Sequence, residues 1–200
     1  MYEWKVKILL LGDKLSGKED FCSKFTLGFS HQFKEYMGVD IFVKNLVINE
    51  NETISLSFWN LTRNQYLKFL LPNFIKGAEF AMIWFNVMKK KSFDEAKFWV
   101  KLVRKELDDL PIILLGNIED FTLRKEIERN EIRTLLNTIN IQIYIETSIN
   151  NNLNIQETLE ILGEILANSK KLNKPLIDFQ NINTNVKQKI EKLTKLYNLI

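Results

Sequence analysis

The sequence has little cysteine, little net charge and no long hydrophobic run. Cys22 is the one cysteine among 200 residues, so an internal disulfide and a cysteine-based zinc cluster are both excluded. The formal net charge is only +3 and the charges are interspersed, which argues against nucleic acid as a partner. No apolar run approaches the roughly 18 residues of a membrane-spanning helix, and the N-terminus has no signal-peptide pattern. We therefore expect an intracellular, cytoplasmic protein.

Composition and hydrophobic periodicity fit one α/β domain. The chain is 46% hydrophobic and 26% charged, as soluble globular proteins are. Periodicity switches repeatedly between period 2 and period 3.6, which predicts a mostly parallel sheet with helices on both faces and one antiparallel edge hairpin. The six expected strands cover residues 4–11, 39–48, 53–59, 80–85, 111–115 and 141–145. The expected helices cover residues 20–27, 64–76, 92–107, 126–138 and 154–167.

Local signals mark how three of these helices begin or break. Ser92 precedes Glu95 at the spacing of a capping box, which predicts a helix start at Ser92. Asn154 is the expected cap of the helix that follows it. Pro72 is expected to interrupt the short helix within residues 64–76.

A separate amphipathic helix is expected at the C-terminus. The domain is expected over residues 1–168, a polar linker over 169–183 and the helix over 184–200. Such a helix can pack back on the domain, or it can bind a partner helix or a membrane surface. Two heptads do not decide between these interpretations. Its apolar residues, at heptad-like spacing, are Val186, Ile190, Leu193, Tyr197 and Ile200.

The segment after the first strand has the pattern of a phosphate-binding loop. Gly12 and Gly17 stand five residues apart and are followed by Lys18 and a helical segment. In this pattern backbone N–H groups surround an anion and the lysine reaches its terminal phosphates. The next residue should be Ser or Thr, because that hydroxyl ligates Mg²⁺, but the chain has Glu19. The candidate phosphate-binding residues are Gly12, Asp13, Lys14, Leu15, Ser16, Gly17, Lys18 and Glu19.

Four further motifs follow in order, in residues 38–44, 59–87, 116–120 and 146–148. The loop at 12–18, the Asn60 region and the loops after Gly116 and Ile145 are expected at one edge of the predicted sheet. The chain resembles a Ras-superfamily small GTPase, most similar to the Rab branch, over about residues 4–168. This resemblance implies the P-loop NTPase fold of a small G domain. Residues 38–44 resemble the first switch and residues 59–87 the second switch with its following strand. Residues 116–120 resemble the Asn-Lys-x-Asp guanine motif, and residues 146–148 the Glu-Thr-Ser loop over the base.

The base side of the implied nucleotide site is retained. The resemblance implies that Asn117 and Asp120 recognise guanine, with the carboxylate accepting hydrogen bonds from the ring N–H and the amino group. Ile118 replaces the family's lysine and loses its polar contacts. The alternative is that Asn117 and Asp120 are merely turn residues. The other residues expected to line the base pocket are Phe29, Thr147, Ser148 and Ile149.

The phosphate and metal side departs from the family pattern. Glu19, Tyr36 and Asn60 stand at the positions of the family's Mg²⁺ site, so Mg²⁺ is expected to be absent or bound in a non-standard way. Asn64 occupies the position of the glutamine that orients the attacking water, and Leu15 fills a position that is usually glycine. Glu19 can repel phosphate, occupy the empty loop by pairing with Lys18 or Lys14, ligate Mg²⁺ directly or face solvent.

These departures favour a degenerate Rab-like GTP-binding protein, a regulatory or scaffold module rather than an enzyme, with GTP or GDP as possible ligand. One alternative is an active, atypical GTPase with a rebuilt metal site, and another is a nucleotide-free interaction module. The candidate partner surface is Tyr66, Leu67 and Phe69, with the C-terminal helix as a second possibility. No cysteine follows Cys22, so no prenyl anchor is expected. We expect membrane contact to be peripheral at most.

Overall fold

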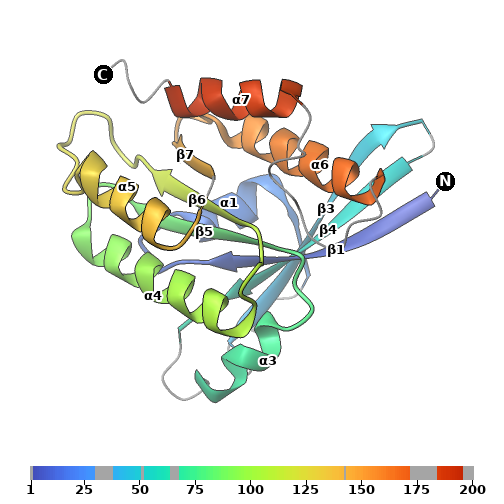
Figure 1. Cartoon of the computed structure of the whole chain (residues 1–200), viewed down its shortest axis with the longest axis horizontal. Coiled ribbons are helices and arrows are strands. Elements are labelled where there is room, and N and C mark those ends of the chain that lie inside the picture. Colours follow the sequence, from blue (N-terminus) through green and yellow to red (C-terminus); the bar gives the residue numbers. More distant parts are fainter. Residues whose placement is uncertain are drawn as a thin grey trace.

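The computed structural model describes residues 2–29, 38–50, 52–63, 68–141, 143–171 and 184–195. Within these ranges the chain forms a seven-stranded sheet in the order β2-β3-β4-β1-β5-β6-β7. Helices cover both of its faces (Figure 1). None of the described helices combines the length and the apolar character that crossing a membrane requires.

The predicted mostly parallel sheet is confirmed. Strand β1 pairs in parallel with β4 and β5, and β5, β6 and β7 continue the parallel order. Strands β3 and β4 form the antiparallel hairpin. The additional short strand β2 pairs antiparallel with β3 at the edge. The strands are β1 (Tyr2–Leu11), β2 (Leu27–Phe29), β3 (Val39–Asn49), β4 (Glu52–Leu61), β5 (Phe80–Asn86), β6 (Ile112–Asn117) and β7 (Ile143–Thr147).

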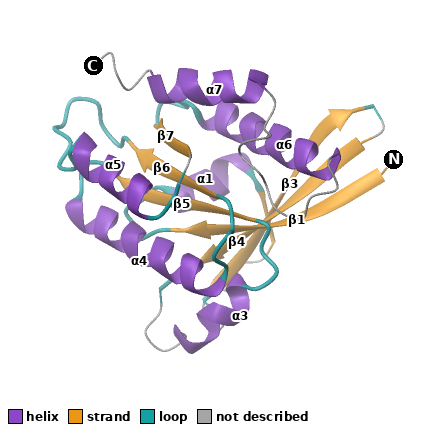
Figure 2. Cartoon of the chain, in the orientation of Figure 1, coloured by secondary structure: helices purple, strands orange, loops and turns teal. Residues whose placement is uncertain are grey.

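The helices divide between the two faces of the sheet (Figure 2). Residues of α1, α6 and α7 contribute to one apolar cluster, and residues of α3, α4 and α5 to the other. The helices are α1 (Lys18–Phe25), the 3₁₀ helix η1 (Lys68–Leu70), α3 (Leu71–Ile75), α4 (Lys90–Glu106), α5 (Arg129–Thr138), α6 (Ile155–Lys171) and α7 (Thr184–Lys195).

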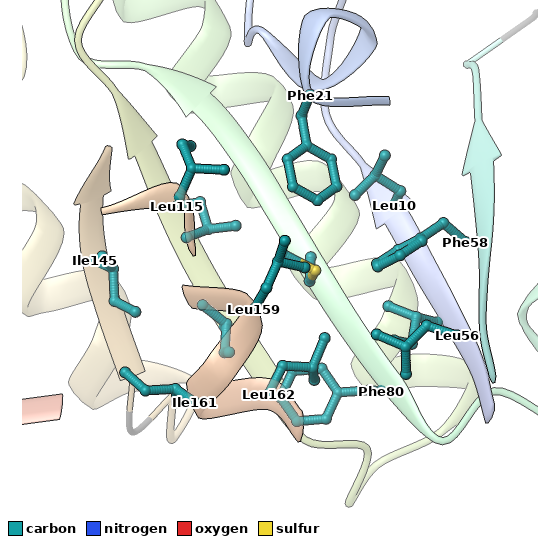
Figure 3. Close-up of a cluster of buried hydrophobic side chains, with 14 of the residues drawn as sticks. Leu10, Phe21, Leu56, Phe58, Phe80, Leu115, Ile145, Leu159, Ile161 and Leu162 are labelled. Atoms are coloured by element: carbon teal, nitrogen blue, oxygen red, sulfur yellow. The ribbon is translucent and has the colours of Figure 1, made fainter. Parts of the chain in front are cut away.

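Strand β1 supplies both apolar clusters because successive side chains point to opposite faces of a sheet. Ile8 and Leu10 belong to the cluster under α1 and α6, whereas Leu9 and Leu11 belong to the cluster under α4. Every residue of β5 and β6 is buried, as expected for strands covered on both faces. Figure 3 shows the first cluster, in which Phe21 of α1 lies over the central strands.

One helix-start prediction and one helix-break prediction are wrong. Helix α4 begins at Lys90, and Ser92 is buried inside its first turn. The Ser92 hydroxyl forms hydrogen bonds with residues outside the helix. The described helix with a reciprocal capping box is α5, between Glu128 and Glu131. Pro72 does not interrupt a helix but lies in the first turn of α3, where a proline is tolerated because its missing N–H has no helical partner.

The C-terminal helix packs against the domain over the residues that the structure describes. Val186 and Leu193 are buried in the first apolar cluster, and Ile190 packs against it. Helix α7 lies beside α6 (Figure 1), and Lys189 forms an ion pair with Glu164 of that helix. Burial of the heptad-like residues accounts for their spacing within α7. The heptad positions 197 and 200 lie outside the described residues.

Candidate functional site

Two glycines give the loop between β1 and α1 its shape. Gly12 has φ +142° and Gly17 has φ +90°, a region that side chains disfavour. A Cβ on Gly12 would lie 2.5 Å from the carbonyl oxygen of Trp84, and one on Gly17 would lie 2.5 Å from Nδ2 of Asn117. The loop is therefore pressed against both the end of β5 and the guanine-motif asparagine.

Hydrogen bonds hold the loop in a closed turn. The Ser16 hydroxyl donates to the carbonyl oxygen of Asp13 over 2.7 Å and accepts from the backbone N–H of Lys18 over 3.4 Å. The Asp13 carboxylate accepts from the Ser92 hydroxyl over 2.6 Å. Leu15, whose position is usually glycine in the family, lies at the surface with 47% of its area exposed.

The lysine of the loop is bonded to the protein's own side chains. The Nζ of Lys18 donates to Oε1 of Glu19 and to Oδ1 of Asn60, each over 2.6 Å. The Lys18 side chain is fully buried, whereas that of Glu19 is 31% exposed. A buried ammonium is costly unless a countercharge and hydrogen bonds compensate it. The sequence analysis left several roles open for Glu19, and in the structure Glu19 pairs with Lys18.

This arrangement does not fit a Mg²⁺ ion at the family's position. Glu19 and Asn60 stand at two of the positions that resemble the Mg²⁺ site, and an ammonium group already engages an oxygen of each. A divalent cation bound to the same oxygens would lie against that ammonium and be repelled by it. Among the described residues no group of three or more His, Cys, Asp or Glu side chains could hold a metal.

On the base side, Asn117 joins three segments of the chain. Its side chain is buried, its Oδ1 accepts from the backbone N–H of Ile149 over 3.3 Å, and its Nδ2 faces Gly17. These contacts connect the end of β6 to the loop after β7 and to the phosphate-binding loop. Asn117 therefore has a structural role, whatever ligand the site holds.

Asp120 is presented to solvent as an ionised acceptor. Its Oδ1 accepts from the backbone N–H of Thr122 over 2.8 Å and from the Thr122 hydroxyl over 2.7 Å. These hydrogen bonds, the backbone one first, lower the pKa of Asp120 below its ordinary value of 3.8. Because both of these bonds go to Oδ1, neither of them occupies the lone pairs of Oδ2.

The other residues predicted to line the base pocket are buried around the end of β7. Thr147 and Ser148 are fully buried, and the Thr147 hydroxyl has no hydrogen-bond partner within the described part of the chain. Ser148 accepts from the side-chain amide of Asn151 over 2.9 Å. Ile118 packs in the second apolar cluster. Phe29 ends strand β2, and nothing is described of its side chain.

A polar network that the sequence analysis missed connects the two halves of the site. Asn86, at the end of β5, donates its backbone N–H to the Ser92 hydroxyl and its side-chain amide to Glu119. Ser92 in turn donates to Asp13 of the phosphate-binding loop. A polar residue ending a fully apolar strand is the signal that identifies Asn86 from sequence. The network holds the loops after β1, β5 and β6 at one sheet edge.

A pocket of about 900 Å³ opens beside Asp120. It lies between the loop after β6 and the start of α4, with Met88, Lys89 and Phe121 among its lining residues. Asp120 is the one predicted nucleotide-binding residue that lines it. This pocket is therefore not the phosphate site.

Several predicted functional positions lie outside the described residues. They are Tyr36 of the first switch and Asn64, Tyr66 and Leu67 of the second. Phe69 is described: it belongs to η1, and 69% of its area is exposed.

Comparison with known proteins agrees with the motif order. The model of the Ras family matches residues 7–168. The chain is similar to the Ras-related protein Rab-11C of Dictyostelium discoideum, with 27% identity over 196 residues that make up 97% of this chain and 87% of that protein. The chain therefore belongs to the Ras family, as a Rab-like member of the Ras superfamily of small GTPases.

Proposed function

We propose that this protein binds a guanine nucleotide weakly or without Mg²⁺, does not cycle by hydrolysis, and acts as a regulatory or scaffold module in cytoplasmic trafficking or signalling. Membership of the Ras family implies guanine-nucleotide binding. The observation that carries the rest is the contrast between a retained base side and a phosphate side whose lysine is bonded to Glu19 and Asn60.

Asn117 and Asp120 support guanine as the base. Asp120 has an oxygen available beyond its bonds to Thr122, and its lowered pKa keeps it ionised at neutral pH. An ionised carboxylate accepts from the ring N–H and amino group of guanine. Adenine lacks that pair of donors, so the acceptor would be left unpaired and adenine would be rejected.

Glu19 and Asn60 support the absence of a hydrolytic cycle. A carboxylate about 4 Å from a phosphate costs on the order of 4 kcal/mol at an effective dielectric of ~20, or about a thousandfold in affinity. Glu19 is partly exposed, so solvent and salt reduce this cost. Hydrolysis also needs the metal and a positioned water, and Asn60 and Asn64 replace the family's residues for both.

Protein partners are proposed to bind at the second switch region. Rab-family proteins typically bind effector proteins, and Phe69 offers an exposed aromatic ring in this segment. Nearby, the partly buried rings of Phe74 and Trp59 lie 6.4 Å apart. Tyr66 and Leu67 complete the proposed surface. The C-terminal helix is the weaker candidate, because its described apolar residues pack against the domain.

Nucleotide titration of the purified, nucleotide-stripped protein tests the proposal. We expect calorimetry to detect GDP or GTP but not ADP or ATP, and Asp120→Ala to abolish the preference for guanine. Glu126→Gln, an exposed acid in the same loop, is the matched control and should leave binding unchanged. Equal affinity for ADP and GDP would refute the base assignment.

A single-turnover assay tests the second half of the proposal. GTP held on excess protein should persist for as long as GTP in buffer alone. Hydrolysis that exceeds the buffer rate and is lost on Lys18→Ala would favour the active, atypical GTPase instead.

A further inference from the structure

The ammonium group of Lys18 is already paired with an anion, the carboxylate of Glu19. The Lys18 ammonium lies 2.6 Å from Glu19 Oε1 and 2.6 Å from Asn60 Oδ1, and its side chain is fully buried. Glu19 comes from the first turn of α1, whereas Asn60 comes from β4, 42 residues away in sequence. The fold therefore brings a carboxylate and an amide oxygen to the same cation from two separate elements.

A lysine of this loop pattern serves the terminal phosphates of a nucleotide. An ammonium has three N–H donors, and the two bonds named above direct two of them to Glu19 and Asn60. A phosphate oxygen that approaches Lys18 therefore competes with a carboxylate already bonded there. Glu19 also lies in the first turn of α1, where the helix N-terminus favours negative charge, so it competes with phosphate for that field as well.

The competition becomes more severe as the ligand gains negative charge. Each further phosphate group adds anionic oxygens near the Lys18–Glu19 pair, where a metal ion would ordinarily neutralise them. That neutralisation does not fit here, because a metal at this position would lie against the Lys18 ammonium, which engages one oxygen each of Glu19 and Asn60. The second oxygen of Glu19, Oε2, is buried without a hydrogen-bond partner in the described part of the chain, so Lys18 is the contact that holds the carboxylate.

We propose that Glu19 is the specificity-determining residue of the phosphate site. It is a resident anion for Lys18, so that the site takes a guanine nucleoside diphosphate in preference to the triphosphate and does so without a divalent cation. This inference rests on the proposed guanine-nucleotide binding and specifies which nucleotide that site selects.

Calorimetric titration of the full chain with GDP and with a non-hydrolysable GTP analogue, each in excess MgCl₂ and in excess EDTA, tests the inference. We expect GDP to bind at least about tenfold more tightly than the analogue, from one added unit charge a few ångströms from a partly screened carboxylate. GDP should still bind when EDTA replaces MgCl₂, since no metal bridges ligand and protein. The preference for GDP should be largest in EDTA, where no Mg²⁺ neutralises the phosphates of the analogue.

Glu19→Gln and Asp20→Asn form a matched pair of variants. Glutamine keeps an oxygen for Lys18 but removes the charge, so the GDP preference should fall below about threefold. Asp20 is an exposed acid in the same turn of α1; its replacement removes one charge at the adjacent position and should leave the preference intact. Thermal melts of both variants establish that they are folded.

The outcomes separate this inference from the function on which it rests. Guanine-specific binding with equal or tighter affinity for the triphosphate analogue in EDTA, or GDP binding that is lost when EDTA replaces MgCl₂, overturns the role of Glu19 and leaves guanine binding standing. A preference for GDP that persists in folded Glu19→Gln also overturns it. Absence of guanine-nucleotide binding in the wild type and in Glu19→Gln overturns both.

Discussion

Replacing Gly17 by alanine tests whether the phosphate-binding loop and the guanine motif support each other. The new Cβ would lie 2.5 Å from Asn117 Nδ2 and 2.9 Å from Ile149 Cδ1, so Asn117 must move. Its buried bond from the Ile149 N–H would then be lost, at about 1 kcal/mol. The φ of +90° adds backbone strain of about 1–2 kcal/mol. We expect the free energy of unfolding to fall by about 2–3 kcal/mol.

Gly77 provides the matched control. It also has a positive φ, +73°, but a Cβ there would meet no atom within 4 Å, so Gly77→Ala carries only the backbone strain of about 1 kcal/mol. Urea unfolding followed by tryptophan fluorescence, without added nucleotide, gives both values. If Gly17→Ala cost no more than Gly77→Ala, the proposed contact between loop and guanine motif would be wrong.

A double-mutant cycle isolates the contact further. In an Asn117→Ala background the side chain that Gly17→Ala displaces is absent. The second substitution should then cost about 1 kcal/mol less than it does in the wild type, because contacting residues are not additive. Strict additivity would contradict the reasoning.

Three further predictions concern other parts of the molecule. Hydrogen bonds lower the pKa of Asp120 from 3.8, so the carboxylate stays ionised above pH 3.8 and is protonated only at lower pH. Calorimetry should therefore give the same contribution of Asp120 to GDP affinity, measured against Asp120→Ala, at about pH 5 and pH 8. Phe21→Ala removes a buried ring that contacts Phe58 and Trp84, and should lower the free energy of unfolding by about 3–5 kcal/mol in urea. Val186→Asp places an unpaired charge at a buried position and should release α7, which faster amide hydrogen exchange in that helix would show. Lys187→Asp, at an exposed position, should leave the exchange of α7 unchanged. Equal exchange in the two variants would contradict the docking of α7.

Local pattern predicted most of the architecture, apart from the three-residue edge strand β2. The apolar runs that became β5 and β6 are buried on both faces, and such strands are recognisable from composition alone because every position must be apolar. The sequence also identified Gly12 and Gly17 as loop glycines, and the structure requires glycine there because a side chain would face a positive φ and close neighbours. Element ends were less predictable: α6 continues to Lys171, because the last turns of a helix depend on what packs against them.

The sequence by itself determined the order of the main strands and helices, the phosphate-loop pattern at Gly12 to Lys18 and the predicted guanine motif, because each depends on neighbouring residues. Only the tertiary structure decided what those residues contact. Asn60 reaches Lys18 across 42 positions, and Ser92 reaches Asp13 across 79, so the hydroxyl that looked like a helix cap serves the loop after β1. The alternation of strands and helices predicted which loops share one edge of the sheet, but which side chains meet there depends on the tertiary packing, and no local pattern encodes that.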